Sequence, residues 1–256
     1  MPNLFDLKGK KAVVTGGSSG LGVQFAKALA RQGADVAVVA RRIEKLEKVR
    51  DELKEIGVDS IAVKCDVSKT DDIANAVDEI LKYFGTIDIL VNNAGLGLME
   101  PAHTQSNETW EKMIDVNVNG VYYFTREVAS KVMIEKQYGR IINIGSIHST
   151  VAMLGSPISA YCTTKGAVEM MTRALANEWA EYNITVNAVG PGYFPSEMTE
   201  DVLEDKEFLQ AIKTFCPMKR TGKDGELDGI IVYLASDASS YTTGQLIQID
   251  GGWTTV

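Results

Sequence analysis

Apolar and polar residues alternate along the chain in two patterns. Short runs rich in Val, Ile and Ala are separated by longer segments whose apolar residues recur at three- and four-residue steps. The longer segments, such as residues 20–32, 43–56 and 71–84, are predicted to be amphipathic helices. The short runs are predicted to be seven strands, at residues 12–15, 36–40, 61–63, 87–91, 141–144, 185–189 and 246–249.

The regular alternation of strand and helix predicts an α/β fold. Strands buried on both faces are short and continuously apolar, so we expect a doubly wound, seven-stranded parallel sheet with helices on both faces. A chain of 256 residues with 45% hydrophobic content can form one large core, and residues 1–256 are predicted to be a single domain. The least regular segment, residues 193–225, is predicted to be a helical insertion that covers a substrate site.

Charge and cysteine usage exclude several classes of protein. The formal net charge of -8 and the sequence pI of about 4.9 argue against a nucleic-acid partner, which would select a basic face. Cys65, Cys162 and Cys216 have no disulfide or ligand spacing, which favours a cytoplasmic location. No apolar run reaches the roughly 18 residues of a membrane span, and no cluster has metal-ligand spacing, so neither a membrane nor a metal is expected.

The first predicted strand runs directly into a glycine-rich turn, Thr15-Gly16-Gly17-Ser18-Ser19-Gly20-Leu21-Gly22, where a helix begins. A dinucleotide pyrophosphate needs backbone without a Cβ and free N–H groups at a helix start. Such turns also occur for structural reasons alone, but after a first strand this one indicates a Rossmann fold. The predicted cofactor contacts in the turn are Gly16, Ser18, Ser19, Gly20, Leu21 and Gly22.

Two arginines follow the second predicted strand. An NAD-binding protein has an acidic residue there for the ribose hydroxyls, whereas this chain has Ala40 followed by Arg41 and Arg42. A guanidinium pairs with a 2′-phosphate, so NADP(H) is predicted in preference to NAD. For Arg42 the alternative of an ordinary basic start to a surface helix remains open.

The glycine spacing TGxxxGxG resembles that of the short-chain dehydrogenase/reductase family. Other motifs follow in the family's order over essentially the whole chain: Asn92-Asn93-Ala94-Gly95, Tyr161 to Lys165 in a YxxxK spacing, Pro191-Gly192, and a structural turn at Asp250-Gly251-Gly252. The resemblance implies an oxidoreductase that interconverts a secondary alcohol and a ketone, with hydride passing to or from nicotinamide. It also implies a homotetramer.

The same resemblance implies the rest of the cofactor site. Asp66 and Val67, after the third strand, would meet the adenine, although Asp66 could equally cap a helix before Ser68. Residues on the adenosine and nicotinamide sides would be Asn93, Ala94, Gly95, Tyr161, Lys165, Pro191, Gly192, Phe194 and Ser196.

The YxxxK spacing places Tyr161 and Lys165 on one face of a helix, where the ammonium would favour the phenolate. By resemblance, Ser146 would hydrogen-bond the substrate oxygen, Tyr161 would exchange its proton, and Lys165 would also hold the nicotinamide ribose. Asn117 would position a water that connects Lys165 to solvent.

Ser146 and Tyr161 are 15 positions apart, more than the family spacing implies, so loop 147–159 in the substrate wall is predicted to be enlarged. Ser149 is a competing assignment, and Ser146 is preferred because it directly ends a strand. His148 could face the substrate or be an ordinary satisfied loop histidine.

For the substrate, residues 191–205 and 216–222 look most like gluconate 5-dehydrogenases, which implies 5-keto-gluconate reduction. A bile-acid hydroxysteroid dehydrogenase is the alternative favoured by the apolar residues Leu96, Leu98, Met153 and Leu154. A 3-oxoacyl carrier-protein reductase, a Rossmann methyltransferase and a non-enzymatic nucleotide sensor also remain open. Fold and catalytic set are shared by enzymes for many substrates.

Overall fold

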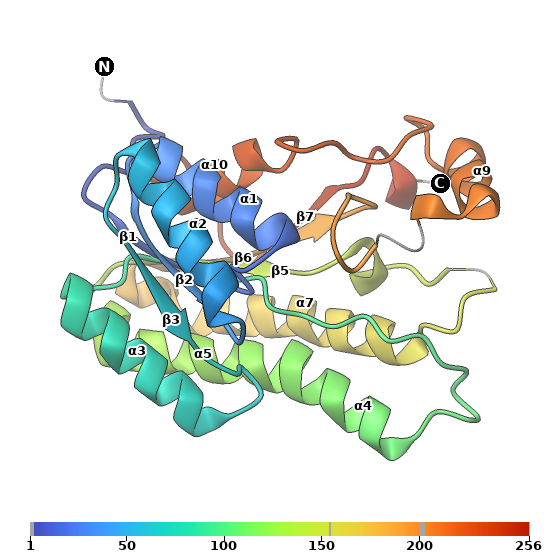
Figure 1. Ribbon diagram of the computed structural model, residues 1–256, viewed down its shortest axis with the longest axis horizontal. Helices are drawn as coiled ribbons and strands as arrows, with labels where there is room; N and C mark the ends of the chain where they lie inside the picture. Colours follow the sequence, from blue (N-terminus) through green and yellow to red (C-terminus); the bar gives the residue numbers. More distant parts are fainter. Residues whose placement is uncertain (1–2, 154, 200–202, 256) are drawn as a thin grey trace.

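A parallel sheet forms the centre of the molecule (Figure 1). The structure is a computed structural model that describes residues 3–153, 155–199 and 203–255, and in this part of the chain seven strands pair in parallel in the order β3-β2-β1-β4-β5-β6-β7. The strands are β1 Lys11–Thr15, β2 Asp35–Ala40, β3 Ser60–Lys64, β4 Ile89–Asn92, β5 Gly139–Ile144, β6 Ile184–Pro191 and β7 Leu246–Ile249.

The predicted fold class and all seven predicted strands are confirmed, with strand ends that differ by at most two residues from the predicted ones. β4 begins at Ile89 and not at Ile87. Asp88, just before it, bridges the neighbouring strands through its backbone: its N–H donates to Lys11 O at 2.8 Å, and its carbonyl accepts from Arg140 N at 2.9 Å.

Helices cover both faces of the sheet. The α-helices are α1 Gly20–Arg31, α2 Ile43–Ile56, α3 Thr70–Phe84, α4 Asn107–Ile114, α5 Gly120–Val128, α6 Ile134–Lys136, α7 Ser159–Trp179, α9 Lys206–Phe215 and α10 Asp228–Ala235. In Figure 1, α1, α2 and α10 lie on one face, and α3, α5 and α7 lie on the other. The three helices predicted from periodicity correspond to α1, α2 and α3.

Alternate strand residues supply two cores. Val36 and Val38 of β2 pack under α1 and α2, whereas Ala37 and Val39 pack toward α3 and α5. This is the period-two alternation of a strand buried on both faces. In the part of the chain that the structure describes, no helix is both long enough and apolar enough to span a membrane.

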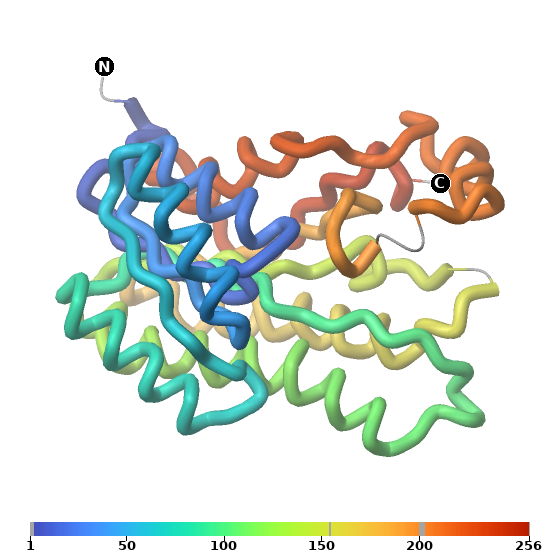
Figure 2. The backbone as a smooth tube through the Cα atoms, in the orientation of Figure 1, coloured from blue at the N-terminus to red at the C-terminus, as the bar shows by residue number. Residues whose placement is uncertain are grey.

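The segment 193–225 includes α9, so its predicted helical content is present. Tyr193 packs edge-to-face on Phe208 of α9 and on Trp253, with ring centroids 4.8 and 5.3 Å apart. In Figure 2 this orange segment and the red C-terminal segment lie on the same side of the molecule. That the segment covers a substrate stays a prediction.

A buried polar chain links the sheet to the α5 and α7 side. Asn92 of β4 donates to Thr125 Oγ1 at 2.7 Å and to Asn143 Oδ1 at 2.9 Å, and Asn143 donates to Thr172 Oγ1 of α7 at 2.9 Å. Asn92, Asn143 and Thr172 are at most 3% exposed. Because every member has a partner, the chain stabilises this packing.

Replacing Asn143 with Leu keeps the approximate volume of the side chain but removes both of its hydrogen bonds. We expect the free energy of unfolding to fall by about 1–3 kcal/mol, because buried partners on Asn92 and Thr172 are left unsatisfied. Urea unfolding followed by circular dichroism measures the change. The control Asn107→Leu, at the exposed start of α4, should cost less than about 0.5 kcal/mol; equal losses in both variants would contradict the account.

Candidate active site

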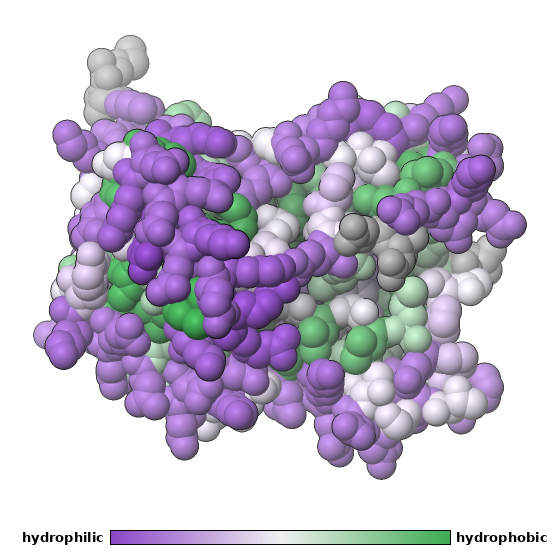
Figure 3. All heavy atoms as spheres, viewed as in Figure 1, coloured by the Kyte–Doolittle hydropathy of each residue, from purple (hydrophilic) through white to green (hydrophobic). Residues whose placement is uncertain are grey.

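A cleft of about 520 Å3 lies at the carboxyl ends of the strands. Its position is the crevice between β1 and β4, where the strand order reverses, which is the usual ligand site of open α/β sheets. In the view of Figure 3, hydrophilic residues predominate over α2 and α3, and paler and hydrophobic residues gather toward the middle of the molecule. With the exception of Gly22, every residue predicted to bind cofactor lines the cleft.

The glycine turn after β1 is tightly packed. Gly16 has a φ of +66°, and a Cβ there would lie 2.7 Å from Asn93 Nδ2. A Cβ on Gly22 would lie 2.3 Å from Gly16 O, so this glycine serves the packing of α1 and does not line the cleft. The turn fits a cofactor pyrophosphate, because its backbone faces the cleft with no Cβ and α1 starts there.

Asn93 holds this turn in place. Its side chain donates to Thr15 O at 3.0 Å and to Gly16 O at 3.3 Å, while Thr15 Oγ1 accepts from the N–H groups of Asn93 and Ala94 at 3.0 and 3.1 Å. The amide predicted to line the adenosine side therefore also ties the loop after β4 to β1.

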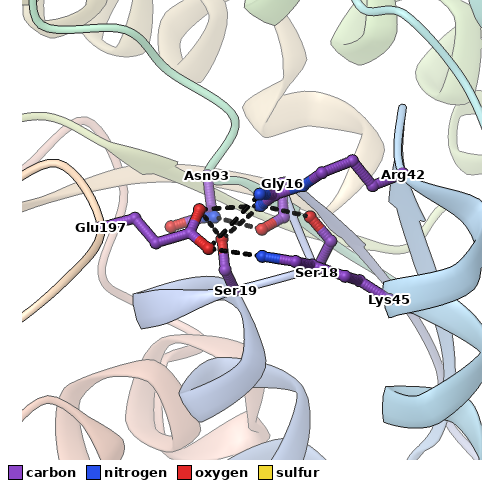
Figure 4. A network of polar contacts seen from close by, with 7 residues as sticks. All are labelled: Gly16, Ser18, Ser19, Arg42, Lys45, Asn93 and Glu197. Carbon is purple, nitrogen blue, oxygen red and sulfur yellow. Dashed lines mark hydrogen bonds and ion pairs between the residues drawn. The ribbon is translucent and has the colours of Figure 1, made fainter.

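A cluster of polar side chains lies beside the glycine turn, at the end of the cleft where adenosine is predicted to bind (Figure 4). Arg42 Nη2 donates to Ser18 Oγ at 3.2 Å, to Ser19 Oγ at 2.8 Å and to Glu197 Oε2 at 2.8 Å, and Lys45 Nζ donates to Glu197 Oε1 at 2.7 Å. An ordinary basic helix start would not contact the glycine turn in this way, so the geometry favours a binding role for Arg42. These donors form an anion site.

Arg41 and Asp66 line the cleft beside this cluster. Asp66 Oδ1 accepts from Ser68 N at 3.1 Å and from Ser68 Oγ at 2.8 Å. These bonds form a local turn before α3, whose N-cap is Lys69, so Asp66 does not cap the helix. Burial acts to raise the pKa of Asp66, but the bonds from Ser68 and the charge of Arg41 outweigh it, and the pKa is lowered.

Ser146, Tyr161 and Lys165 come together at the opposite end of the cleft. Ser146 lies two residues after the end of β5, and its Oγ accepts from His148 N at 3.1 Å. Lys165 Nζ donates to Ile144 O at 2.8 Å and lies 5.7 Å from the centre of the Tyr161 ring. The carbonyl at the end of β5 therefore fixes the ammonium beside the tyrosine.

Ser149, the competing assignment to Ser146, forms hydrogen bonds with the backbone. Its Oγ donates to Lys165 O at 2.9 Å and accepts from Ser146 N at 3.3 Å, and Ser149 is not among the residues that line the cleft. The geometry thus favours Ser146 over Ser149.

Asn117 lies in a π-helical turn, Asp115–Asn119, beneath the cleft. It is 1% exposed, exchanges hydrogen bonds with Leu96 N and O at 2.7 and 2.8 Å, and donates to Thr164 Oγ1 at 3.0 Å. A Cβ on Gly95 would lie 3.5 Å from Asn117 Oδ1 and 3.7 Å from Lys165 Nζ, so both groups approach one point. Its predicted role in holding a water stays a prediction.

Burial dominates the acid–base properties of the pair on α7. It raises the pKa of Tyr161 to about 12, against the lowering effect of a hydrogen bond with Ser146. Burial also lowers the pKa of Lys165 to about 8. From the sequence, the Lys165 ammonium is expected to favour the Tyr161 phenolate and so to lower the pKa of Tyr161. Desolvation of the hydroxyl is the larger effect, and the pKa is raised instead.

The contacts of His148 match those of an ordinary satisfied loop histidine, and His148 is not among the residues that line the cleft. Its Nδ1 lies 3.0 Å from Val151 O, so Nδ1 carries the proton, and Nε2 accepts from Tyr193 OH at 3.3 Å. The ring is 8% exposed, burial lowers its pKa, and its centre lies 6.1 Å from that of Tyr161. It is a satisfied histidine that borders the tyrosine.

Of the four apolar residues predicted to rim the pocket, two line the cleft. Leu96 and Leu98 line the cleft, Met153 Sδ lies 3.3 Å from Tyr193 OH, and Leu154 lies outside the described residues. In the described ranges, no group of three or more His, Cys, Asp or Glu residues could hold a metal ion.

Fold and site define an oxidoreductase of the dinucleotide-binding α/β class that acts on alcohols and ketones. The family model described as Enoyl-(Acyl carrier protein) reductase matches residues 16–254, and the chain belongs to the short-chain dehydrogenase/reductase family. The resemblance seen in the sequence is thereby confirmed.

Three relatives illustrate the match. The gluconate 5-dehydrogenase of Gluconobacter oxydans (strain 621H) is 38% identical over 253 residues, 99% of this chain and 98% of the relative. The 3-oxoacyl-[acyl-carrier-protein] reductase of Staphylococcus aureus (strain Mu50 / ATCC 700699) is 39% identical over 245 residues, 95% and 97% of the two chains. A crystal structure of a gluconate 5-dehydrogenase from Burkholderia cenocepacia J2315 in complex with NADP and tartrate has a TM-score of 0.95 at 35% identity, and covers 99% of this chain and 98% of that chain.

Replacing Gly16 with Ala tests whether the crowded turn is essential. The variant should lose at least about 1 kcal/mol more stability than Gly85→Ala and should no longer bind NADPH tightly, because its Cβ meets Asn93. Gly85 is the matched control: its φ is +76°, and a Cβ there meets nothing within 4 Å. Thermal unfolding and NADPH fluorescence titration report the two effects, and equal behaviour of the variants would refute the packing argument.

Proposed function

We propose that the protein is an NADP(H)-dependent gluconate 5-dehydrogenase that interconverts a secondary alcohol and a ketone and reduces 5-keto-gluconate. The observation that carries the chemistry is the convergence of Ser146, Tyr161 and Lys165 at one end of a cleft whose other end is a glycine turn. The sugar-acid substrate is supported by the gluconate 5-dehydrogenases among its relatives.

The cofactor assignment is supported by the donors at the adenosine end. The Ser19 hydroxyl, the Arg42 guanidinium and the Lys45 ammonium already bind one anion, the Glu197 carboxylate. A 2′-phosphate is an anion of the same kind, so the residues fit NADP(H). A gluconate 5-dehydrogenase of the same fold binds NADP.

When bound, NADP(H) would supply or accept the hydride. Ser146 Oγ would donate a hydrogen bond to the substrate oxygen, and the Tyr161 hydroxyl would give its proton to that oxygen in reduction, or take it in oxidation. Lys165, held by Ile144 O, would keep a positive charge beside Tyr161 and bind the nicotinamide ribose. Asn117 would hold the water that leads protons to Lys165.

We also propose a cytoplasmic homotetramer with no nucleic-acid or membrane partner, in which the 193–225 segment covers the substrate. The net charge of -8 supports the absence of a nucleic-acid partner, and the resemblance to the short-chain dehydrogenase/reductase family implies the homotetramer. The second candidate is a 3-oxoacyl carrier-protein reductase, supported by the Staphylococcus aureus relative and by Leu96 and Leu98 in the cleft lining.

The substrate is tested by following NADPH absorbance with 5-keto-gluconate, acetoacetyl thioester and an oxo bile acid. We expect turnover to be fastest with 5-keto-gluconate. Faster turnover of the acetoacetyl thioester would instead support the carrier-protein reductase.

Tyr161→Phe should lower kcat by about 10²–10⁴-fold and leave the Kd for NADPH unchanged, because it removes only the transferable proton. A Tyr161→Phe variant with wild-type kcat would show that Tyr161 is not the residue that exchanges the proton.

The pKa values predict the pH profile. With a pKa of about 12, Tyr161 is protonated at neutral pH and ready to act as an acid, whereas Lys165, with a pKa of about 8, loses its charge as pH rises through that value. We expect kcat/KM for ketone reduction to be flat from about pH 6 to 7.5 and to fall above about pH 8. Steady-state rates in buffers of constant ionic strength measure it. A reduction rate that increases between about pH 7 and 9 would contradict these assignments.

A further inference from the structure

The Glu197 carboxylate is fully engaged at the adenosine end of the cleft (Figure 4). Oε2 accepts from Ser19 Oγ at 2.9 Å and from Arg42 Nη2 at 2.8 Å, and Oε1 accepts from Lys45 Nζ at 2.7 Å and Arg42 Nη1 at 3.3 Å. Hydrogen bonds from Arg42, Lys45 and Ser19, in that order, lower the pKa of Glu197 to about 2, so the group is an anion across the physiological range.

The donors around Glu197 come from separate parts of the chain. Ser19 precedes α1, Arg42 precedes α2, and Lys45 lies in the first turn of α2, three residues after Arg42 and therefore on the same side of the helix. A hydroxyl, a guanidinium and an ammonium beside two helix starts are the groups that bind phosphate in proteins.

These donors cannot serve two anions at once. Arg42 Nη2 has two hydrogens and already faces three oxygens, on Ser18, Ser19 and Glu197. A phosphate placed against the same donors would also lie beside a carboxylate of like charge, which is unfavourable. A phosphate can therefore bind here only if Glu197 leaves.

We propose that Glu197 competes with the 2′-phosphate of NADP(H) for Ser19, Arg42 and Lys45, and that Lys45 is a second cation of the 2′-phosphate site. This inference rests on the proposed use of NADP(H). Glu197 sets how strongly the protein distinguishes NADP(H) from NAD(H), because only the phosphorylated cofactor must displace it.

The residues beside Glu197 connect this exchange to the rest of the cleft. A Cβ on Gly20 would lie 3.2 Å from Ser196 Cβ, and a Cβ on Gly97 would lie 3.2 Å from Met198 Sδ and 3.8 Å from Tyr161 Cε2. Displacing Glu197 therefore moves a segment that touches the glycine turn on one side and the neighbourhood of Tyr161 on the other.

The test uses adenosine 2′,5′-bisphosphate and 5′-AMP, which differ only in the 2′-phosphate, titrated calorimetrically into the full-length protein. Exposed ion pairs are individually weak, so we expect Glu197→Gln to bind the bisphosphate about fivefold more tightly and Lys45→Gln about fivefold more weakly. Affinity for 5′-AMP should be unchanged in both variants. Glu44→Gln, one residue before Lys45 on α2, is the charge-matched control and should bind both nucleotides like the wild type.

Two failures are distinguishable. If the wild type and Arg42→Ala bind both nucleotides equally well, the NADP(H) assignment is wrong. If the wild type prefers the bisphosphate but Glu197→Gln binds it no more tightly, the competition is overturned while the NADP(H) assignment stands. Hydrogen exchange gives a readout independent of affinity: residues 191–199 should exchange faster with the bisphosphate than with 5′-AMP, and equal exchange would overturn the displacement of the segment.

Discussion

The contact between the glycine turn after β1 and the loop after β4 is the constraint on which the site depends. Gly22 lets α1 press against the Gly16 carbonyl, and the Asn93 amide then ties the turn to the neighbouring strand end. Because β1 and β4 lead to opposite sides of the sheet, their loops diverge above this junction, and the start of α1 faces the resulting crevice. A side chain on either glycine would force this junction apart.

The end of β5 performs a similar task at the other side of the cleft. The Ile144 carbonyl binds the Lys165 ammonium, and Ser146 follows two residues later. One strand end therefore positions two of the three residues in the proposed catalytic group, Ser146 and Lys165, while α7 sets Tyr161 one helical turn from Lys165. Asn117 approaches from below through a π-helical turn, a distortion frequent at functional sites.

The strands and most cleft residues could be predicted because their signals are local. A buried parallel strand is a continuous apolar run, and residues that follow such strands must meet at one edge of the sheet. Glu197 and Lys45 left no local signal: they are 152 residues apart, and their contact depends on how the segment after β6 folds back over α2.

The effect of burial on the pKa values of the site could not be predicted from the sequence either. The spacing of Tyr161 and Lys165 predicted that they share a helix face, and they do, but it could not show how strongly the interior desolvates each group. The pKa of the hydroxyl is consequently raised and that of the ammonium lowered. His148 is a further example, since its Val151 and Tyr193 partners arise from a loop whose path periodicity does not describe.

The central claim is that one cleft holds NADP(H) at its adenosine end and the reacting oxygen at Ser146 and Tyr161. A crystal structure of the protein with NADP and gluconate tests it most directly. The account predicts a substrate hydroxyl within hydrogen-bond distance of Ser146 Oγ and Tyr161 OH, and a 2′-phosphate on Arg42 and Lys45. A 2′-phosphate directed into solvent, or a substrate that contacts neither hydroxyl, would contradict it.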